Sequence, residues 1–203
     1  MEINTVIFDL GNVLVKYDWE TFLKSFGFEE NTYRAVADAV FLSDVWQWGD
    51  AGLSPEEELR LFIEQAPEFE KEIRMVHEKL AGCISKYEYT DQLIAYYREK
   101  GFKIYYLSNY SEDVYNKTKE ELSFIESFDG GVFSYKEKCI KPDEKIYQIL
   151  LERYEIIPET ALFLDDREEN IEAAKRLGIQ GEVFTEDFLN KILAEKGDEY
   201  TYE

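Results

Sequence analysis

The sequence predicts an α/β protein with a doubly wound parallel sheet and a helical cap inserted after the first strand. Short apolar runs alternate with helical patterns over most of the chain. This order is typical of parallel strands joined by right-handed helical crossovers. A long segment behind the first strand lacks a convincing strand and is rich in Glu, Leu, Phe and Ala. Such a block is most simply a helical insertion into the sheet domain.

The expected strands are short runs rich in β-branched or aromatic residues, the pattern of strands that are buried on both faces. The first run lies close to the N-terminus and stops at an aspartate. The runs cover residues 5–10, 103–108, 131–134, 161–164 and 182–184.

Helical patterns fill the intervals between these strands, and each carries a start or stop signal. Ser111, followed by two acids, is a capping residue, and Pro142 precedes another helix start. Gly101 and Gly178 end two further helices. The core helices are expected at residues 90–100, 111–122, 143–154 and 166–177.

The inserted block is expected to contain four helices. Breaks in the pattern fall at residues 49–52, which contain two glycines, and at Ala66-Pro67. We therefore divide the chain into a core of residues 1–15 and 89–203 and a cap of residues 16–88, with hinges at the two junctions. The cap helices are expected at residues 18–26, 32–42, 55–65 and 68–82.

The composition excludes several kinds of partner. A formal net charge of −21 repels nucleic acid and anionic membranes, so we expect neither as a partner. No apolar run approaches the roughly 18 residues of a membrane span, and the N-terminus lacks the basic start of a signal peptide. Cys83 and Cys139 lie far apart without metal-ligand spacing. We expect two free thiols and a cytoplasmic protein.

Polar groups follow four of the expected strands, at the point where each strand ends or shortly beyond it. Because ligands bind outside the carboxyl ends of parallel strands, these groups are expected to meet at one edge of the sheet. An anion site in so acidic a protein must be locally positive, through a metal ion, a lysine or helix N-termini. The groups are Asp9, Ser108, Asn109, Lys141, Asp165 and Asp166.

Three carboxylates at one edge would repel each other strongly. A Mg²⁺ ion would remove this conflict, because it prefers oxygen ligands and often bridges protein carboxylates to a substrate phosphate. Lys141 and the Ser108 hydroxyl would hold other phosphate oxygens, helped by N–H groups near Asn109. Asp9, on a strand expected at the centre of the sheet, would attack phosphorus and form an aspartyl phosphate.

These residues stand in four motifs that resemble, in the same order, those of phosphatases of the haloacid dehalogenase superfamily. The motifs are VIFDLGNV, YYLSN, IKPD and LFLDDREEN. The resemblance implies that Asp9 is the nucleophile and a metal ligand. It implies that Ser108 and Lys141 bind phosphate, and that Lys141 also acts in catalysis.

The resemblance extends over nearly the whole chain. It implies a Rossmann-like core and a small four-helix cap in the inserted block. Asp166 would be the direct metal ligand and Asp165 a second contact, while Asn170 would support their turn. Within the superfamily, FDLGNVLV and DDREENIEAAKRLG resemble a branch of small sugar-phosphate phosphatases, one member of which acts on α-D-glucose 1-phosphate.

One position departs from the pattern of the superfamily. Most of its phosphatases have a second aspartate two residues after the nucleophile, which protonates the leaving alcohol and later activates water. This chain has Gly11 there. The Gly11 backbone carbonyl would still serve the metal, but the acid/base role is unfilled. A sugar 1-phosphate leaves more readily than an ordinary alkoxide, so we expect a slower phosphatase in which solvent or a cap residue supplies the proton.

Other functions remain as alternatives. A 2-haloacid dehalogenase uses the same aspartate on carbon without a metal and also lacks the second aspartate, but the Asp165-Asp166 pair argues against it. A sugar phosphomutase would need acid/base help more than a phosphatase, so Gly11 counts against it. A non-catalytic module that binds a phosphorylated ligand is the rival from outside the enzymes.

Four further side chains are candidates for a binding or catalytic site. His77, the only histidine, is expected to be solvated or packed in the cap, so a histidine-based hydrolase is not expected. Phe41, Trp46 and Trp48 are expected to pack the cap, with the floor of a sugar pocket as the alternative. The sequence thus predicts a monomer or weak dimer that hydrolyses a small-molecule phosphate monoester, with a sugar phosphate as the favoured class.

Overall fold

A five-stranded parallel sheet forms the centre of the protein. The computed structural model describes residues 2–199, so the outermost residues of the expected core, 1 and 200–203, lie outside the described part. The strand order is β5-β4-β1-β6-β7, and every neighbouring pair is parallel. The predicted parallel sheet is confirmed, with β1 at its centre. The strands are β1 (Thr5–Phe8), β4 (Lys103–Ser108), β5 (Gly130–Phe133), β6 (Ala161–Asp165) and β7 (Gln180–Val183).

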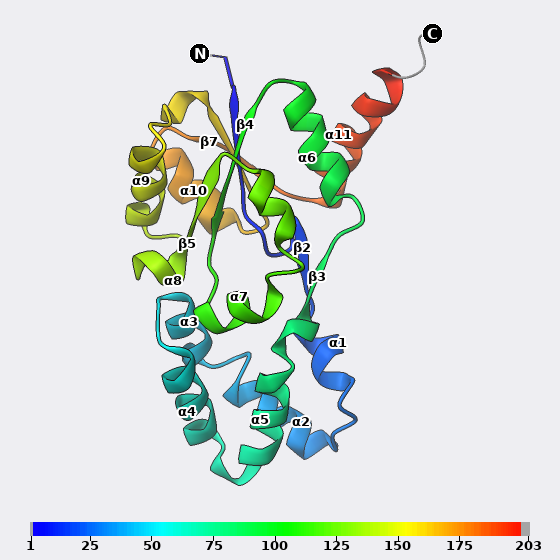
Figure 1. Ribbon diagram of the computed structural model, residues 1–203, viewed down its shortest axis with the longest axis vertical. Helices are drawn as coiled ribbons and strands as arrows, with labels where there is room; N and C mark the ends of the chain where they lie inside the picture. The colour runs from blue at the N-terminus through cyan, green and yellow to red at the C-terminus, as the bar shows by residue number, and fades with distance from the viewer. Residues whose placement is uncertain (1, 200–203) are drawn as a thin grey trace.

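Helices cover both faces of the sheet (Figure 1). Successive side chains of β1 point to opposite faces, as in any strand. Val6 and Phe8 belong to one apolar cluster with residues of α6 (Thr90–Glu99) and α11 (Glu186–Glu199). Ile7 belongs to a second cluster with residues of α9 (Glu144–Arg153) and α10 (Glu168–Arg176). This two-sided burial explains the continuous apolar run in the sequence.

Three core helices differ from the expected pattern, and one of them, α11 (Glu186–Glu199), was not predicted. The helix expected over 111–122 is shorter, since α7 (Glu112–Thr118) is followed by the 3₁₀ helix η3 (Ser123–Ser127). Another helix that was not predicted, α8 (Ser134–Glu137), follows β5 directly and ends at Lys138, whose φ is 54°. One turn is too short to show helical periodicity, so the sequence gives no signal for it. A further 3₁₀ helix, η4 (Pro158–Thr160), precedes β6.

The helices of the inserted block gather at the end of the molecule opposite the N-terminus (Figure 1). Four of them overlap the expected helices, and α3 was not predicted because residues 49–52 were interpreted as a break. The block also contains the 3₁₀ helices η1 (Pro67–Phe69) and η2 (Leu80–Cys83). Its α-helices are α1 (Trp19–Lys24), α2 (Glu30–Ala39), α3 (Asp44–Asp50), α4 (Pro55–Gln65) and α5 (Glu70–Glu78).

A two-stranded antiparallel ribbon connects the inserted block to the core. In it, β2 (Val15–Tyr17) pairs with β3 (Ile84–Lys86), so that the outgoing and returning chains lie side by side. The expected junction after residue 15 falls inside β2, and the junction after residue 88 lies just beyond β3. Strands of three residues show no alternation pattern, which is why the sequence did not predict this ribbon.

The structure also bears on two expectations from the sequence, the lack of a membrane span and the two free thiols. Within residues 2–199, no helix combines the length and the apolar character needed to cross a membrane. Cys83 and Cys139 are both buried free thiols, as the sequence predicted.

Candidate active site

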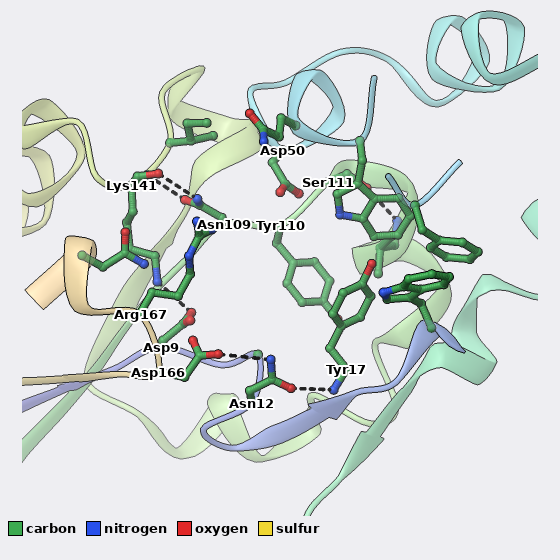
Figure 2. A pocket seen from close by; sticks show the side chains of 18 of the residues that line it. Asp9, Asn12, Tyr17, Asp50, Asn109, Tyr110, Ser111, Lys141, Asp166 and Arg167 are labelled. Atoms are coloured by element: carbon green, nitrogen blue, oxygen red, sulfur yellow. Dashed lines mark hydrogen bonds and ion pairs between the residues drawn. The ribbon is translucent and has the colours of Figure 1, made fainter. Parts of the chain in front are cut away.

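A cavity of about 610 Å³ lies at the carboxyl edge of the sheet. Its walls come from residues that follow β1, β4 and β6, from the loop before α9, and from the inserted block. Figure 2 shows Asp9, Lys141 and Asp166 on one side of this cavity and Asp50 on another. The polar residues expected at the strand ends are therefore brought to one place, although the side chains of Ser108 and Asp165 are buried behind the cavity wall and that of Asn109 is bonded to the backbone of Lys141.

Lys141 lies buried between two carboxylates. Its Nζ is 2.9 Å from Asp9 Oδ1 and 2.6 Å from Asp165 Oδ2. Burial alone would lower the pKa of the lysine, but the attraction of Asp165 and Asp9 outweighs it and raises that pKa. The lysine is therefore a fixed positive charge at the cavity wall, next to the aspartate expected to attack phosphorus.

Asp165 is fully buried, and donors of the protein occupy both of its oxygens. The Asn170 Nδ2 group donates to Oδ1 at 2.9 Å and to Oδ2 at 3.0 Å. The Arg167 backbone N–H donates to Oδ1 at 2.9 Å, and Lys141 Nζ donates to Oδ2. Asp165 thus fixes the position of the Lys141 ammonium group, while Asn170 and the Arg167 backbone fix Asp165.

Asp166 is more open to the cavity than Asp165. Its Oδ2 accepts a hydrogen bond of 3.2 Å from Asn12 Nδ2, and Asn12 Oδ1 accepts one of 3.2 Å from the Tyr17 backbone N–H (Figure 2). These bonds connect the end of β6 to the turn after β1. On the same turn, Asp9 Oδ1 accepts a bond of 2.7 Å from the Leu10 N–H. The two acids are therefore held at the same edge by backbone and amide donors.

The three aspartates fit a divalent cation. Asp9, Asp165 and Asp166 each offer one oxygen, and these oxygens lie within 4.8 Å of one another. Burial, followed by repulsion from Asp165, raises the pKa of Asp9 to about 7 against the opposing effect of Lys141. Burial and then Asp165 also raise the pKa of Asp166, although the Asn12 hydrogen bond opposes them. An all-oxygen donor set under this repulsion suits Mg²⁺.

Ser108 and Asn109 do not present their side chains to the cavity as expected. Ser108 is 1% exposed, and among residues 2–199 it does not belong to those that line the cavity. Asn109 lines the cavity, but its side chain is bonded to the backbone of Lys141. Its Nδ2 donates to Lys141 O at 3.1 Å, and its Oδ1 accepts from Lys141 N at 2.8 Å. In this arrangement Asn109 positions the lysine.

Gly11 lines the cavity two residues after Asp9. A Cβ atom built on Gly11 would have no neighbour within 4 Å. The space around position 11 therefore accepts a Cβ atom. The acid that is missing from the sequence is not excluded by the space around position 11.

Asp50 is a cavity residue that the sequence reasoning missed. It is the last residue of α3, and its carboxyl group points into the cavity (Figure 2). Burial and the nearby Asp9 raise its pKa to about 7, against the opposing effect of Lys141. The available signal was the Ser43-Asp44 pair, which is typical of a helix start. The sequence nevertheless did not predict α3, because Gly49 and Gly52 favoured a loop.

Aromatic rings of the inserted block form another wall of the cavity. Trp19 stacks on Phe41 with 5.1 Å between ring centroids, and Phe41 lies 5.4 Å from Trp46. Tyr17 continues the series at 5.7 Å from Trp46. Phe41 and Trp46 therefore pack against each other, as expected, and also line the cavity. The expected packing of Trp48 is wrong, because its side chain is 50% exposed.

His77 lies away from the cavity. Its Nε2 is 3.0 Å from Asp113 Oδ2, so it joins α5 of the inserted block to α7 of the core. Asp113 also pairs with Lys117. Burial would raise the pKa of Asp113, but the hydrogen bonds of His77 and Lys117 outweigh it and lower that pKa. His77 is thus a contact between the two parts of the chain, and it does not line the site.

A parallel sheet with an inserted helical cap, and with an aspartate, a lysine and an acid pair meeting at its carboxyl edge, is the architecture of a capped α/β enzyme. Comparison with known families gives the class more closely. The model of the haloacid dehalogenase-like hydrolases matches residues 3–178, and the chain belongs to this family. The family resemblance of the four motifs is therefore confirmed.

Several relatives are informative. The sesquiterpene phosphatase astK of Aspergillus oryzae is 24% identical over 180 residues, which are 86% of each chain. A phosphorylated carbohydrates phosphatase of Thermotoga maritima is 42% identical over 53 residues, 26% of this chain and 24% of that protein. A haloacid dehalogenase family enzyme of Bacteroides thetaiotaomicron, solved with magnesium and inorganic phosphate, is 25% identical with a TM-score of 0.69. That match covers 90% of this chain and 94% of that one.

Proposed function

We propose that this hydrolase is a Mg²⁺-dependent phosphatase that cleaves a small phosphate monoester through an aspartyl phosphate. The observation that carries the proposal is the convergence of Asp9, Lys141 and Asp166 on one cavity, with Asp165 buried directly behind them. The phosphatase names of the two curated relatives, and the magnesium and phosphate in the Bacteroides enzyme, support it. Phosphate monoesters are the substrates for which a cation, a lysine and a nucleophilic carboxylate serve together.

Each residue has a role in this reaction. Asp9 Oδ2 would attack phosphorus, since Oδ1 accepts from Leu10 N–H and faces Lys141. The buried Lys141 ammonium would attract the phosphoryl oxygens, and Asn109 and Asp165 would hold it in place. Asp9, Asp166 and the Gly11 carbonyl, with Asp165 as a further contact, would hold the metal, whose bound charge offsets that of the phosphate. The Ser108 hydroxyl would bind a phosphate oxygen, although its side chain is buried beneath the residues that line the cavity.

The substrate class that we propose is a sugar phosphate, with α-D-glucose 1-phosphate as the first candidate. The motif resemblance supports it, and so does the wall of aromatic rings, since a pyranose presents an apolar face of C–H groups to such rings. A cavity of about 610 Å³ suits a small molecule. We assign residues 16–88 to a cap that closes over this substrate and residues 1–15 and 89–203 to the core.

We infer a cytoplasmic location and a monomer or weak dimer. The two buried free thiols support a reducing compartment. The net charge of −21 supports the expected lack of nucleic-acid and membrane partners, because a surface this acidic repels both.

The decisive test is phosphate release from p-nitrophenyl phosphate with Mg²⁺ and with EDTA. We expect turnover that requires Mg²⁺ and is lost in Asp9→Asn, whereas Asp38→Asn, at an exposed position of α2, retains it. A panel of sugar phosphates, with α-D-glucose 1-phosphate included, then identifies the substrate class.

Each rival function predicts a different outcome. Chloride release from 2-chloropropionate in EDTA would favour the dehalogenase, and isomerisation of the sugar phosphate without phosphate release would favour the mutase. Binding without any turnover would favour the ligand-binding module.

A further inference from the structure

The proposed reaction lacks an acid among the core residues of the cavity. Cleavage of a P–O bond to an alcohol leaves an alkoxide that requires a proton, and the later attack of water requires a base. Gly11 has no side chain for these steps. Lys141 is bonded to two carboxylates, and Asp165 has donors on both oxygens. The acid must come from elsewhere in the cavity or from solvent.

Asp50 offers a carboxyl group from the side of the cavity formed by the inserted block. Figure 2 shows it directed into the cavity that Asp9 faces from the core. Among the described residues, it has no hydrogen-bond donor and no ion-pair partner. A carboxyl group in this setting is not committed to a structural contact, so it is free to exchange a proton with a bound molecule.

Two close contacts hold the end of α3 in place. Gly49 packs so tightly on the Glu58 side chain that a Cβ atom there would overlap the Glu58 carboxyl group. Gly52, at φ +95°, lies against the core, because a Cβ atom there would be 2.7 Å from the Tyr135 carbonyl oxygen. Asp50 stands between these glycines. The segment is therefore fixed both to α4 and to the core next to α8, which keeps Asp50 over the cavity.

The charges around Asp50 favour its protonated form. Burial raises the pKa of Asp50 most, repulsion from Asp9 raises it further, and Lys141 opposes both, so that this pKa is about 7. A group that is protonated in a large fraction of molecules near neutral pH serves both as an acid and as a base. The ionisable groups that interact with Asp50 are Asp9, Lys141, Glu58, Tyr17 and Tyr110.

We propose that Asp50 is the general acid and general base of this enzyme, in the role that Gly11 leaves unfilled. This inference rests on the proposed phosphatase function. In the first step, the Asp9 carboxylate oxygen bonds to phosphorus, the bond between phosphorus and the alcohol oxygen breaks, and that oxygen takes the Asp50 proton. In the second step, a water oxygen bonds to phosphorus and gives a proton to the Asp50 carboxylate. The bond between phosphorus and the Asp9 oxygen breaks, which releases phosphate.

A pair of matched probes tests the proposal. p-Nitrobenzyl phosphate and p-nitrophenyl phosphate differ by one methylene, but only the first leaves as an alkoxide that needs a proton. We expect Asp50→Asn to lower kcat/KM, which reports only the first step, by about a hundredfold or more for p-nitrobenzyl phosphate and by less than about tenfold for p-nitrophenyl phosphate. Asp38→Asn serves as the matched control at an exposed cap position and should leave both rates unchanged.

A rescue experiment adds an independent readout. Because the space around position 11 accepts a Cβ atom, Gly11→Asp introduces a second carboxyl group near Asp9. We expect the double variant Gly11→Asp, Asp50→Asn to regain part of the lost turnover of p-nitrobenzyl phosphate. A role of Asp50 in binding or folding alone would not be rescued in this way.

The outcomes separate this inference from the proposed function. If the wild type releases no phosphate from either probe, the phosphatase proposal itself fails. If the wild type turns over both probes and Asp50→Asn lowers kcat/KM equally for both, or for neither, Asp50 is not the acid. Loss of both activities with an unchanged melting temperature and no rescue at position 11 would also overturn the inference.

Discussion

Glu58 lies in the first turn of α4 with only 2% of its surface exposed, and its Oε2 has no hydrogen-bond partner in the protein. Burial, together with repulsion from Asp113 and Asp50, raises its pKa to about 8 from the ordinary value of 4.5. The folded protein therefore keeps a proton on Glu58 that the unfolded chain loses above pH 4.5. Folding must take up this proton, so the stability should fall as the pH rises from 4.5 to about 8.

The variant Glu58→Gln removes the titration while keeping the shape of the side chain. One pKa unit corresponds to about 1.4 kcal/mol, so the shift from 4.5 to about 8 corresponds to roughly 5 kcal/mol above pH 8 and roughly 3 kcal/mol at pH 7. We expect the variant to match the wild type near pH 4.5 and to exceed its free energy of unfolding increasingly at higher pH. Other groups titrate in both proteins and cancel in the difference.

Urea unfolding followed by circular dichroism between pH 4.5 and pH 8 measures this difference. Glu56→Gln, at an exposed position of the same turn, is the matched control and should show a difference that does not grow with pH. The reasoning is refuted if the Glu58→Gln difference stays below about 1 kcal/mol across the range. It is also refuted if the difference grows towards low pH.

Three further predictions follow from the site and the sheet. Lys141→Met leaves its two buried carboxylate partners unpaired, so we expect a loss of about 3–5 kcal/mol at neutral pH in urea unfolding, and a smaller loss as the carboxylates are protonated at lower pH. Gly131→Ala places a methyl group in the ring of Tyr106 and should cost about 1–3 kcal/mol in thermal unfolding, whereas Gly11→Ala, with open space around it, should cost less than about 1 kcal/mol. Mg²⁺ at about 100 times its dissociation constant should stabilise the wild type by about 2.7 kcal/mol in thermal unfolding, and Asp166→Asn should largely lose this effect.

The parts of the fold that the sequence predicted are those where long-range packing and local pattern agree. β1, β4 and β6 are buried on both faces, so their apolar runs are visible without any structure. The ribbon of β2 and β3 is different, because each strand has three residues and pairs with a partner far along the chain. Helix α3 continues through Gly49, whose lack of a side chain is required by the packing of Glu58. That contact lies between elements and leaves no local signal.

The site was predictable to the extent that strand ends locate it. The topology places Asp9, Lys141 and the acid pair at the carboxyl edge in any sheet of this order. The partners of each side chain were not predictable, because they depend on rotamers and loop paths. Asn109 was expected to serve phosphate, yet its amide holds the Lys141 backbone. Asp50 lies in a segment whose position over the cavity depends on packing against the core, and no strand end points to it.

The charge balance of the cavity explains why an acid on the cap would differ from an acid at position 11. A carboxyl group near a bound cation loses its proton readily, and position 11 lies two residues from Asp9, which belongs to the acidic cluster. Asp50 does not belong to that cluster within residues 2–199, so a metal held there would disturb its proton less. If Asp50 supplies the proton, then α3 carries both the acid and Trp46, an aromatic residue that lines the same cavity. Substitutions in α3 should then change kcat and substrate preference together, because one helix positions both groups.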